Sequence, residues 1–280
     1  MTPRDPRTVL REAGLRPKKS FGQNFLVSDA IALAIARAVV PDDDVGRARV
    51  VEIGAGTGAL TVLLAERAAT VAAIERDRDL VPLLAQAFEG TRVRVLEEDA
   101  QSVDLAALLG PPDAPRVLCG NLPYAITGSL MRIAVEHADG LERVVFMVQD
   151  EVARRLTARP GTKEWGALTV FVRAAFDVRR VLRAPPGAFH PPPDVTSAVV
   201  ELVPVRPPRA RETDRFRALV RRAFEARRKT LRNAWAGLAG DSASLERAAA
   251  EAGIRLDARG ETLDVEAFAR MADALGAQIR

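Results

Sequence analysis

Strand-like and helix-like segments alternate through most of this 280-residue chain, and this alternation limits the fold more than any other feature. Runs rich in β-branched residues are each followed by a longer apolar segment with helical spacing. The strand-like runs are residues 49–56, 70–75, 92–99, 116–121 and 143–149, and helical segments include 30–40, 59–69, 79–88, 128–138 and 150–158. Such alternation is typical of βαβ units. We therefore predict an α/β fold with a mostly parallel sheet.

The pattern changes after residue 176. Residues 177–205 contain two strand candidates around a proline-rich loop, which could close the sheet with an antiparallel edge. Prolines and charges interrupt every periodicity at 206–214, and the segments that follow are helical, beginning with a run over 216–239. We predict two domains, residues 1–205 and a small helical domain of residues 206–280.

The residue content excludes several kinds of site. Cys119 is the only cysteine, so an internal disulfide and a thiolate zinc cluster are excluded. With only His137 and His190 as histidines, we expect no protein-bound metal. The sequence has no signal-peptide core and no uninterrupted run of about 18 apolar residues. We therefore expect a cytoplasmic protein that does not enter a membrane.

A glycine-rich turn follows the first strand of the alternating region. Gly54, Gly56 and Gly58 lie between a predicted strand and a predicted helix. Glycines there let the backbone approach a ligand, and the helix that follows favours a polar or anionic group. The spacing is G-x-G-x-G, whereas dinucleotide-binding proteins have G-x-G-x-x-G. A turn without a ligand is the competing interpretation.

Polar side chains also end the next strands. Glu75 lies 21 residues beyond Gly54, where a carboxylate can accept hydrogen bonds from a ribose, and Asp99 could bind an adenine amine. Each acid alone could be a solvent contact. Open α/β sheets bind ligands at the carboxyl ends of their strands, so the Gly, Glu and Asp together favour a ligand site.

The stretch CGNLPYAIT follows the fourth strand. The carboxamide of Asn121 and the backbone carbonyls after it, including that of Leu122, form an array of acceptors suited to an aromatic amine. Tyr124 could stack on the face of a base. Pro123 stiffens the turn and adds no competing donor. The motif predicts a site for an amine on a planar ring.

Positive charge is concentrated after residue 205. Residues 206–232 contain eleven Arg or Lys against three acidic residues, a net charge of +8, whereas the whole chain carries +4. A solvated helix surface is the usual explanation of such a run. The alternative is a phosphate-binding surface, for which the candidates are Arg221, Arg222, Arg227, Arg228, Lys229 and Arg232.

These motifs together resemble S-adenosylmethionine-dependent amino-methyltransferases, and more narrowly the rRNA adenine N6-dimethyltransferase family. The matching blocks occur in order between residues 16 and 235: KKSFGQNFL, VEIGAGTGALT, IERD, GNLPYAIT, FMVQDEVARRLTARPGTKEWGALTV, PPGAFHPPPDVTSAVV and RRKTLRNAW. The resemblance implies a Rossmann-like class I methyltransferase fold with a basic N-terminal extension, followed by a small all-helical domain that binds RNA.

The resemblance also implies roles for individual residues. The residues implied to bind S-adenosylmethionine are Asn24, Leu26, Gly54, Glu75, Asp99 and Asn121. Those implied to surround the target base are Asn121, Leu122, Tyr124 and Phe189. For Phe189, a place in the core is the competing interpretation.

The activity implied is dimethylation of N6 of two adjacent adenines in the 3′-terminal hairpin loop of 16S rRNA, within the immature 30S subunit. We expect the enzyme to be a monomer. Three other functions remain open: an Erm-type methyltransferase of large-subunit rRNA, a ribosome-assembly factor that acts by binding, and a nicotinamide oxidoreductase. The G-x-G-x-G spacing and the Asn-Leu-Pro-Tyr turn argue against the last.

Overall fold

The structure, a computed structural model, describes residues 3–277, which divide by their contacts into two compact units. The first unit comprises the chain up to residue 153 together with 178–204, and the second comprises 154–177 and the chain from 205 onward. The chain therefore passes between the two units after residues 153, 177 and 204. Segment 154–177 belongs to the second unit by its contacts, although the sequence-based division assigns it to the first domain. The roles of the two domains stay predictions.

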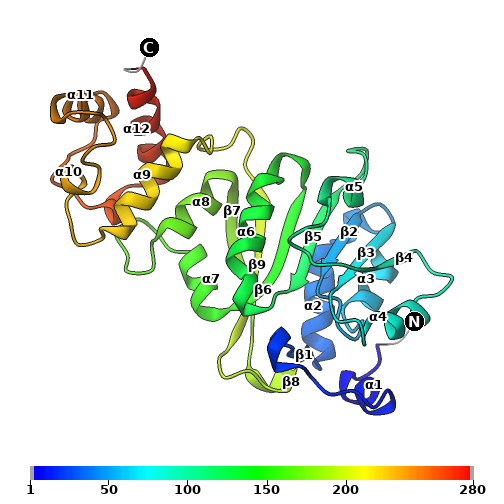
Figure 1. Cartoon of the computed structure of the whole chain (residues 1–280). Helices are drawn as coiled ribbons and strands as arrows, with labels where there is room; N and C mark the ends of the chain where they lie inside the picture. Colours follow the sequence, from blue (N-terminus) through cyan, green and yellow to red (C-terminus); the bar gives the residue numbers. More distant parts are fainter. Residues whose placement is uncertain (1–2, 278–280) are drawn as a thin grey trace. The chain divides into compact units, whose positions relative to one another are not determined.

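A seven-stranded sheet forms the centre of the first unit, in the order β4-β3-β2-β5-β6-β9-β7 (Figure 1). Its strands are β2 (Arg49–Ile53), β3 (Thr70–Glu75), β4 (Val93–Glu97), β5 (Arg116–Asn121), β6 (Arg143–Gln149), β7 (Phe176–Ala184) and β9 (Ser197–Pro204). Strands β2 to β6 pair in parallel, and β9 runs antiparallel to β6. The predicted α/β fold with a mostly parallel sheet is confirmed.

Helices connect the strands and bury apolar side chains against the sheet. They are α2 (Asp29–Val39), α3 (Thr61–Arg67), α4 (Val81–Ala87), α5 (Leu105–Leu109), α6 (Thr127–Glu136) and α7 (Asp150–Leu156), whose last residues belong to the second unit. Helix α1 (Pro6–Glu12) precedes the first strand, and its Leu10 packs with Phe25 and Leu80. Ile35 of α2 and Leu64 of α3 share one buried cluster with Val117, Cys119 and Val145 of the sheet. Alternate residues of β5 and β6 face this cluster, and the residues between them face the other side of the sheet. Both faces are covered, which explains why the sequences of β5 and β6 are continuous apolar runs.

The N-terminal segment contains a strand that its sequence does not predict. In SFGQNFL, β1 (Phe25–Leu26) pairs antiparallel with β8 (Phe189–His190), with Leu26 opposite Phe189. The two short strands lie side by side at the lower edge of the first unit in Figure 1. The pairing joins segments far apart in sequence, and it brings the N-terminal segment to the carboxyl ends of the sheet strands.

The second unit is helical and has its own core. Its helices are α8 (Ala167–Ala175), α9 (Asp214–Glu225), α10 (Leu231–Ala234), α11 (Ser242–Ala252) and α12 (Val265–Ala277). Trp165 and Trp235 are buried in this core, and their indole N–H groups donate to the carbonyls of Leu263 at 3.0 Å and Leu219 at 2.9 Å. Each buried indole N–H therefore has a partner, as a buried polar group requires.

The helical run expected over 216–239 is interrupted. Helix α9 ends at Glu225 and α10 begins at Leu231, so Arg227, Arg228 and Lys229 lie in the turn between two helices. Among the described residues, no helix is long and apolar enough to cross a membrane.

Candidate active site

A cavity of about 420 Å³ lies at the carboxyl ends of the parallel strands. Its walls come from the N-terminal segment 19–25, from the ends of β2, β3, β4 and β5, and from the turn 121–126. Asn24, Gly54, Glu75, Asp99 and Asn121 all line it. This volume lies within the range of small-molecule sites, roughly 300–1,000 Å³. The structure thus brings together five of the residues that the sequence singles out for a ligand.

Two glycines let backbone segments approach closely beside the cavity. Gly54 adopts a φ of +73°, which side chains disfavour, and its N–H donates to the carbonyl of Ile74 at 2.9 Å. At Gly120, an added Cβ would stand 2.4 Å from the carbonyl oxygen of Ile53. Only glycine therefore allows β5 to run this close to β2 immediately before Asn121.

The carboxylate of Glu75 is held by the backbone around it. One oxygen accepts the N–H of Gly56 at 2.7 Å, and the other accepts those of Arg76 at 2.9 Å and Asp77 at 2.8 Å. Burial raises the pKa of Glu75 above its usual value, although these three hydrogen bonds oppose the rise. A carboxylate has roughly four acceptor sites, so a ligand that donates two hydroxyls would have to share one with the backbone.

The Asn-Leu-Pro-Tyr turn is fixed at several points. The Asn121 side-chain NH₂ donates to the carbonyl of Asn24 at 2.9 Å, which leaves the amide oxygen as the group that can accept from a ligand. The Leu122 N–H donates to the carbonyl of Met147 at 3.1 Å. Tyr124 begins a short 3-10 helix, Tyr124–Ile126, and its hydroxyl lies 2.9 Å from the hydroxyl of Ser197. The turn therefore presents its acceptors in one arrangement.

Asp99 lies at the cavity but not within its strand. Strand β4 ends at Glu97, two residues earlier than expected. One Asp99 oxygen accepts the N–H of Gln101 at 3.0 Å, and the other lies 3.5 Å from the guanidinium of Arg76. The carboxylate is partly exposed and keeps acceptor capacity for a ligand amine.

Leu26 and Phe189 lie deeper than the other candidates. Phe189 is 4% exposed and packs in the same buried cluster as Leu26. Neither Leu26 nor Phe189 is among the described residues that line the 420 Å³ cavity. In this structure Phe189 occupies the position of a core aromatic residue, and its contact with a target base stays a prediction.

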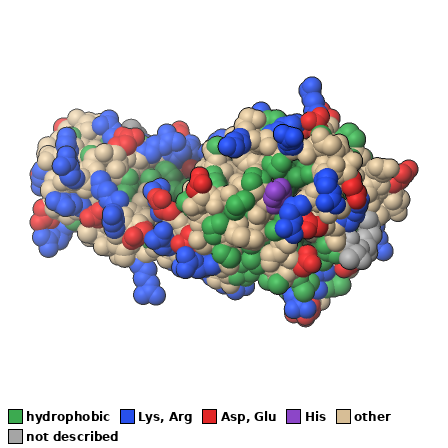
Figure 2. Space-filling view, turned by 90° about the horizontal axis from the view of Figure 1, so that it is seen from below, with side chains coloured by type: hydrophobic (Ala, Val, Ile, Leu, Met, Phe, Trp, Pro, Cys, Tyr) green, Lys and Arg blue, Asp and Glu red, His purple; other side chains and the backbone are tan. Residues whose placement is uncertain are grey.

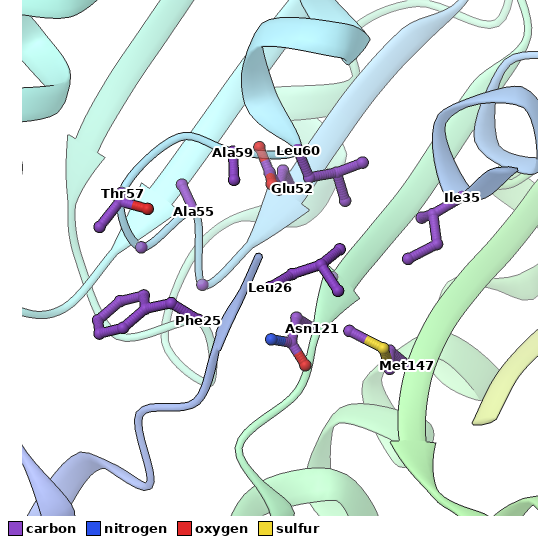
Figure 3. Close-up of a pocket in the computed structure, with 13 residues that line it drawn as sticks. Phe25, Leu26, Ile35, Glu52, Ala55, Thr57, Ala59, Leu60, Asn121 and Met147 are labelled. Atoms are coloured by element: carbon purple, nitrogen blue, oxygen red, sulfur yellow. The ribbon is translucent and has the colours of Figure 1, made fainter. Parts of the chain in front are cut away.

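A second, small cavity of about 40 Å³ lies behind the glycine turn. In Figure 3, Leu26, Asn121 and Met147 line one side of it, and Glu52 and Leu60 line the other. Glu52 is 2% exposed, and its carboxyl group accepts the hydroxyl of Thr61 at 2.6 Å. Burial raises the pKa of Glu52 to about 8, and the nearby charge of Glu75 contributes to the rise.

A polar cluster that the sequence analysis missed anchors the N-terminal segment. The Lys18 ammonium pairs with Asp77 and with Asp79, and the Gln23 side chain donates to Asp77 at 2.7 Å. Burial alone would raise the pKa of Asp77, but the hydrogen bonds from Lys18 and Gln23 lower it overall. Phe21, which lines the cavity, has the cationic groups of Lys18 and Arg76 within 5.5 Å and 5.4 Å of its ring centre. The sequence features that could have predicted this cluster are the lysines in KKSFGQNFL and the acidic residues after Glu75.

The basic candidates of the second unit fall into two groups. Arg227 pairs with Glu261 at 2.8 Å, and Arg232 pairs with Glu246 at 2.5 Å. The other group has no ion pair with any described residue and is exposed; its members are Arg221, Arg222, Arg228 and Lys229. These four cations remain available to an external anion.

The side of the first unit that carries β1 and β8 also mixes charge with apolar surface. Figure 2, seen from that side, shows exposed hydrophobic side chains among Lys and Arg side chains. Such a surface can contact both phosphates and the faces of bases.

Comparison with known proteins shows the family to which this chain belongs. Residues 14–276 match the ribosomal RNA adenine dimethylase family. The ribosomal RNA small subunit methyltransferase A of Geobacter metallireducens is 42% identical over 95% of this chain and 98% of its own length. The protein of the same description from Anaeromyxobacter sp. is 45% identical over 97% and 98%.

Solved structures agree with these matches. A dimethyladenosine transferase from Plasmodium falciparum superposes with a TM-score of 0.75 at 25% identity, over 91% of this chain and 98% of that one. The 23S rRNA methyltransferase ErmE superposes with a TM-score of 0.67 at 27% identity, over 90% and 100%. The chain has a Rossmann-like methyltransferase fold and belongs to the ribosomal RNA adenine dimethylase family.

Proposed function

We propose that this protein dimethylates N6 of two adjacent adenines in the 3′-terminal hairpin loop of 16S rRNA, with S-adenosylmethionine as the methyl donor. The observation that carries the proposal is the Asn-Leu-Pro-Tyr turn, which ends β5 at the edge of a 420 Å³ cavity. The small-subunit enzymes that share 42% and 45% of the sequence support the choice of 16S rRNA. The immature 30S subunit is the proposed form of the substrate.

The cavity suits S-adenosylmethionine in size and in chemistry. The backbone of Gly54, which carries no side chain, leaves room for the cofactor to approach the strand end, and Glu75 offers a fixed carboxylate for ribose hydroxyls. Asp99 would accept from the adenine amine, and Asn121 would bind the amino-acid end. Asn24 would border the cofactor from the cavity wall, and Leu26, which lines the small cavity behind the glycine turn, would border it from behind that wall. We propose that the enzyme acts as a monomer.

The protein's own contribution to methyl transfer is to orient the target amine. S-adenosylmethionine supplies a methyl group that is already electrophilic. The Asn121 amide oxygen and the Leu122 carbonyl would accept the two N6 hydrogens and so favour a tetrahedral nitrogen with its lone pair outside the ring. Positive charge that develops on this nitrogen strengthens both hydrogen bonds in the transition state, and this differential binding raises the rate.

The target base must leave its stack before it can react. Tyr124 lies in the cavity wall and would replace part of the lost stacking, which is worth about 1–3 kcal/mol per base. Dimethylation requires that the same site accept monomethyladenine after the first transfer.

The proposed function is tested by offering the enzyme three RNAs with radiolabelled cofactor: immature 30S subunits, protein-free 23S rRNA and 16S rRNA. We expect two N6-dimethyladenines per 30S subunit, mapped by mass spectrometry to its 3′-terminal loop. Methylation of 23S rRNA alone would assign the chain to the type of ErmE, whose fold it shares. Binding to 30S subunits without methylation would indicate an assembly factor.

RNA binding is expected to depend on the unpaired cations of the second unit. Replacing Arg221, Arg222, Arg228 and Lys229 with glutamine should reduce the slope of log affinity against log salt by up to about 0.7 for each lost phosphate contact. The measurement is RNA binding by fluorescence anisotropy between low and physiological salt. Arg227→Gln with Arg232→Gln is the matched comparison, since Glu261 and Glu246 already partly neutralise these residues. An unchanged slope in the fourfold variant would show that these four residues contact no RNA phosphate and are simply solvated.

A further inference from the structure

Tyr124 is held at both ends, and one of its partners has no assigned role. It is the only tyrosine of the chain, and its ring lines the 420 Å³ cavity. Pro123, with a φ of −57°, and the Leu122 N–H bond to Met147 fix the backbone before it. At the far end, the Tyr124 hydroxyl lies 2.9 Å from the hydroxyl of Ser197.

Ser197 is buried, and its backbone is fixed within the sheet. It is the first residue of β9, is 1% exposed, and lies opposite Gln149 of β6 in the sheet. A buried hydroxyl needs a partner, and here the side chain pairs with a residue 73 positions away. The hydrogen bond therefore ties the rigid edge of the sheet to a side chain in the cavity wall.

Without that bond, the Tyr124 ring would have more freedom. The side chain of a tyrosine turns about two torsions, and the second has a broad profile. The backbone contacts of the turn fix where the ring begins but not the direction in which its face points. Among the residues that the structure describes, the hydrogen bond to Ser197 is the contact that sets this direction.

We propose that Ser197 is a positioning residue, whose hydroxyl holds the Tyr124 ring at the orientation that receives the face of the target base. The identity of that base rests on the proposed function, whereas the hold on the ring does not. Ser197 would act through Tyr124 and would touch neither the methyl donor nor the reacting nitrogen.

Kinetics provide the first test. Ser197→Ala is expected to lower kcat for methyl transfer about tenfold, because a small misplacement of the base is costly, with cofactor affinity unchanged. Tyr124→Phe removes the same hydrogen bond from the other side and should lower kcat by a similar factor. Because both substitutions remove one contact, the double variant should be no slower than the slower single variant. Ser197→Thr, which keeps the hydroxyl, should restore most of the rate. Additive losses in the double variant would contradict the proposal.

A matched control separates this contact from general effects on the turn. The Ser129 hydroxyl donates to the carbonyl of Ile126 at 2.8 Å, next to the same turn, whereas the Tyr124 hydroxyl pairs with Ser197. Ser129→Ala should keep the wild-type kcat. Thermal melting of each variant checks that it is folded.

The second test does not depend on activity. Because Tyr124 is the only tyrosine, ring-labelled tyrosine gives one set of NMR signals from the intact protein. We expect one sharp set in the wild type and in Ser129→Ala, and shifted or exchange-broadened signals in Ser197→Ala. Unchanged ring signals in Ser197→Ala would overturn the proposal whatever the substrate. A wild-type protein that methylates no adenine would instead refute the proposed function, and the ring signals would still decide whether Ser197 holds Tyr124.

Discussion

Replacing Asn121 with alanine is expected to lower methyl transfer at saturating cofactor by about 10²–10³, the usual cost of removing one preorganised hydrogen-bonding group. The Asn121 NH₂ is already bonded to the carbonyl of Asn24, so its oxygen is oriented before any substrate arrives. The alanine variant would lose an acceptor that costs no reorganisation at the moment of reaction. The measurement is single-turnover methylation of the RNA substrate identified above.

Cofactor binding must be measured beside the rate, because Asn121 also borders the cofactor's proposed amino-acid end. Calorimetric titration with S-adenosylmethionine gives that affinity directly. Asn233→Ala, which removes an exposed asparagine of the second unit, is the control and should behave as wild type. A variant of Asn121 that reaches the wild-type rate once cofactor is saturating would limit this residue to cofactor binding and would contradict the mechanism.

The sequence predicted those parts of the site that depend on neighbours in the chain. Gly54, Glu75 and Asn121 each follow a β-branched run, and the run itself shows where a strand ends. Parallel strands bring their carboxyl ends to one edge of the sheet, so three local signals were enough to predict one ligand site. The structure has all three at one cavity.

The parts that sequence did not predict depend on contacts between distant segments. The pairing of β1 with β8, the hydrogen bonds of Lys18 and Gln23 to Asp77, and the bond of Tyr124 to Ser197 have no periodic signature. Two-residue strands are too short for a visible alternation. The contacts of segment 154–177 with the second unit were also missed. Its helix has the same apolar pattern as the helices of the first unit, so the pattern does not show which unit it packs against.

Glu52 carries the prediction with the largest expected effect on stability. Its pKa is about 8 in the folded protein because the carboxyl group is buried, whereas an unfolded chain would ionise it near its ordinary value of 4.5. The unfolded state therefore loses this proton first as pH rises. Between about pH 4.5 and 8 the free energy of unfolding should fall by about 1.4 kcal/mol per pH unit from this group, and above that window the loss should level off.

The variant that isolates this effect is Glu52→Gln, which keeps an oxygen to accept the Thr61 hydroxyl and carries no ionisable proton. It should match the wild type at pH 4 and below and become the more stable protein as pH approaches 8. Glu89→Gln, at an exposed position, is the control and should follow the wild-type curve. Urea unfolding at a series of pH values supplies the measurement.

The two units must be followed separately, and the chain provides a probe for each. Both tryptophans lie in the second unit, so their fluorescence reports on that unit, whereas labelled Tyr124 reports on the first. The pH-dependent difference between wild type and Glu52→Gln should appear in the tyrosine signal, because Glu52 is buried in β2. Parallel pH curves for the two proteins would mean that Glu52 ionises at the same pH in the folded and unfolded states, and the cavity behind the glycine turn would then hold a negative charge at neutral pH.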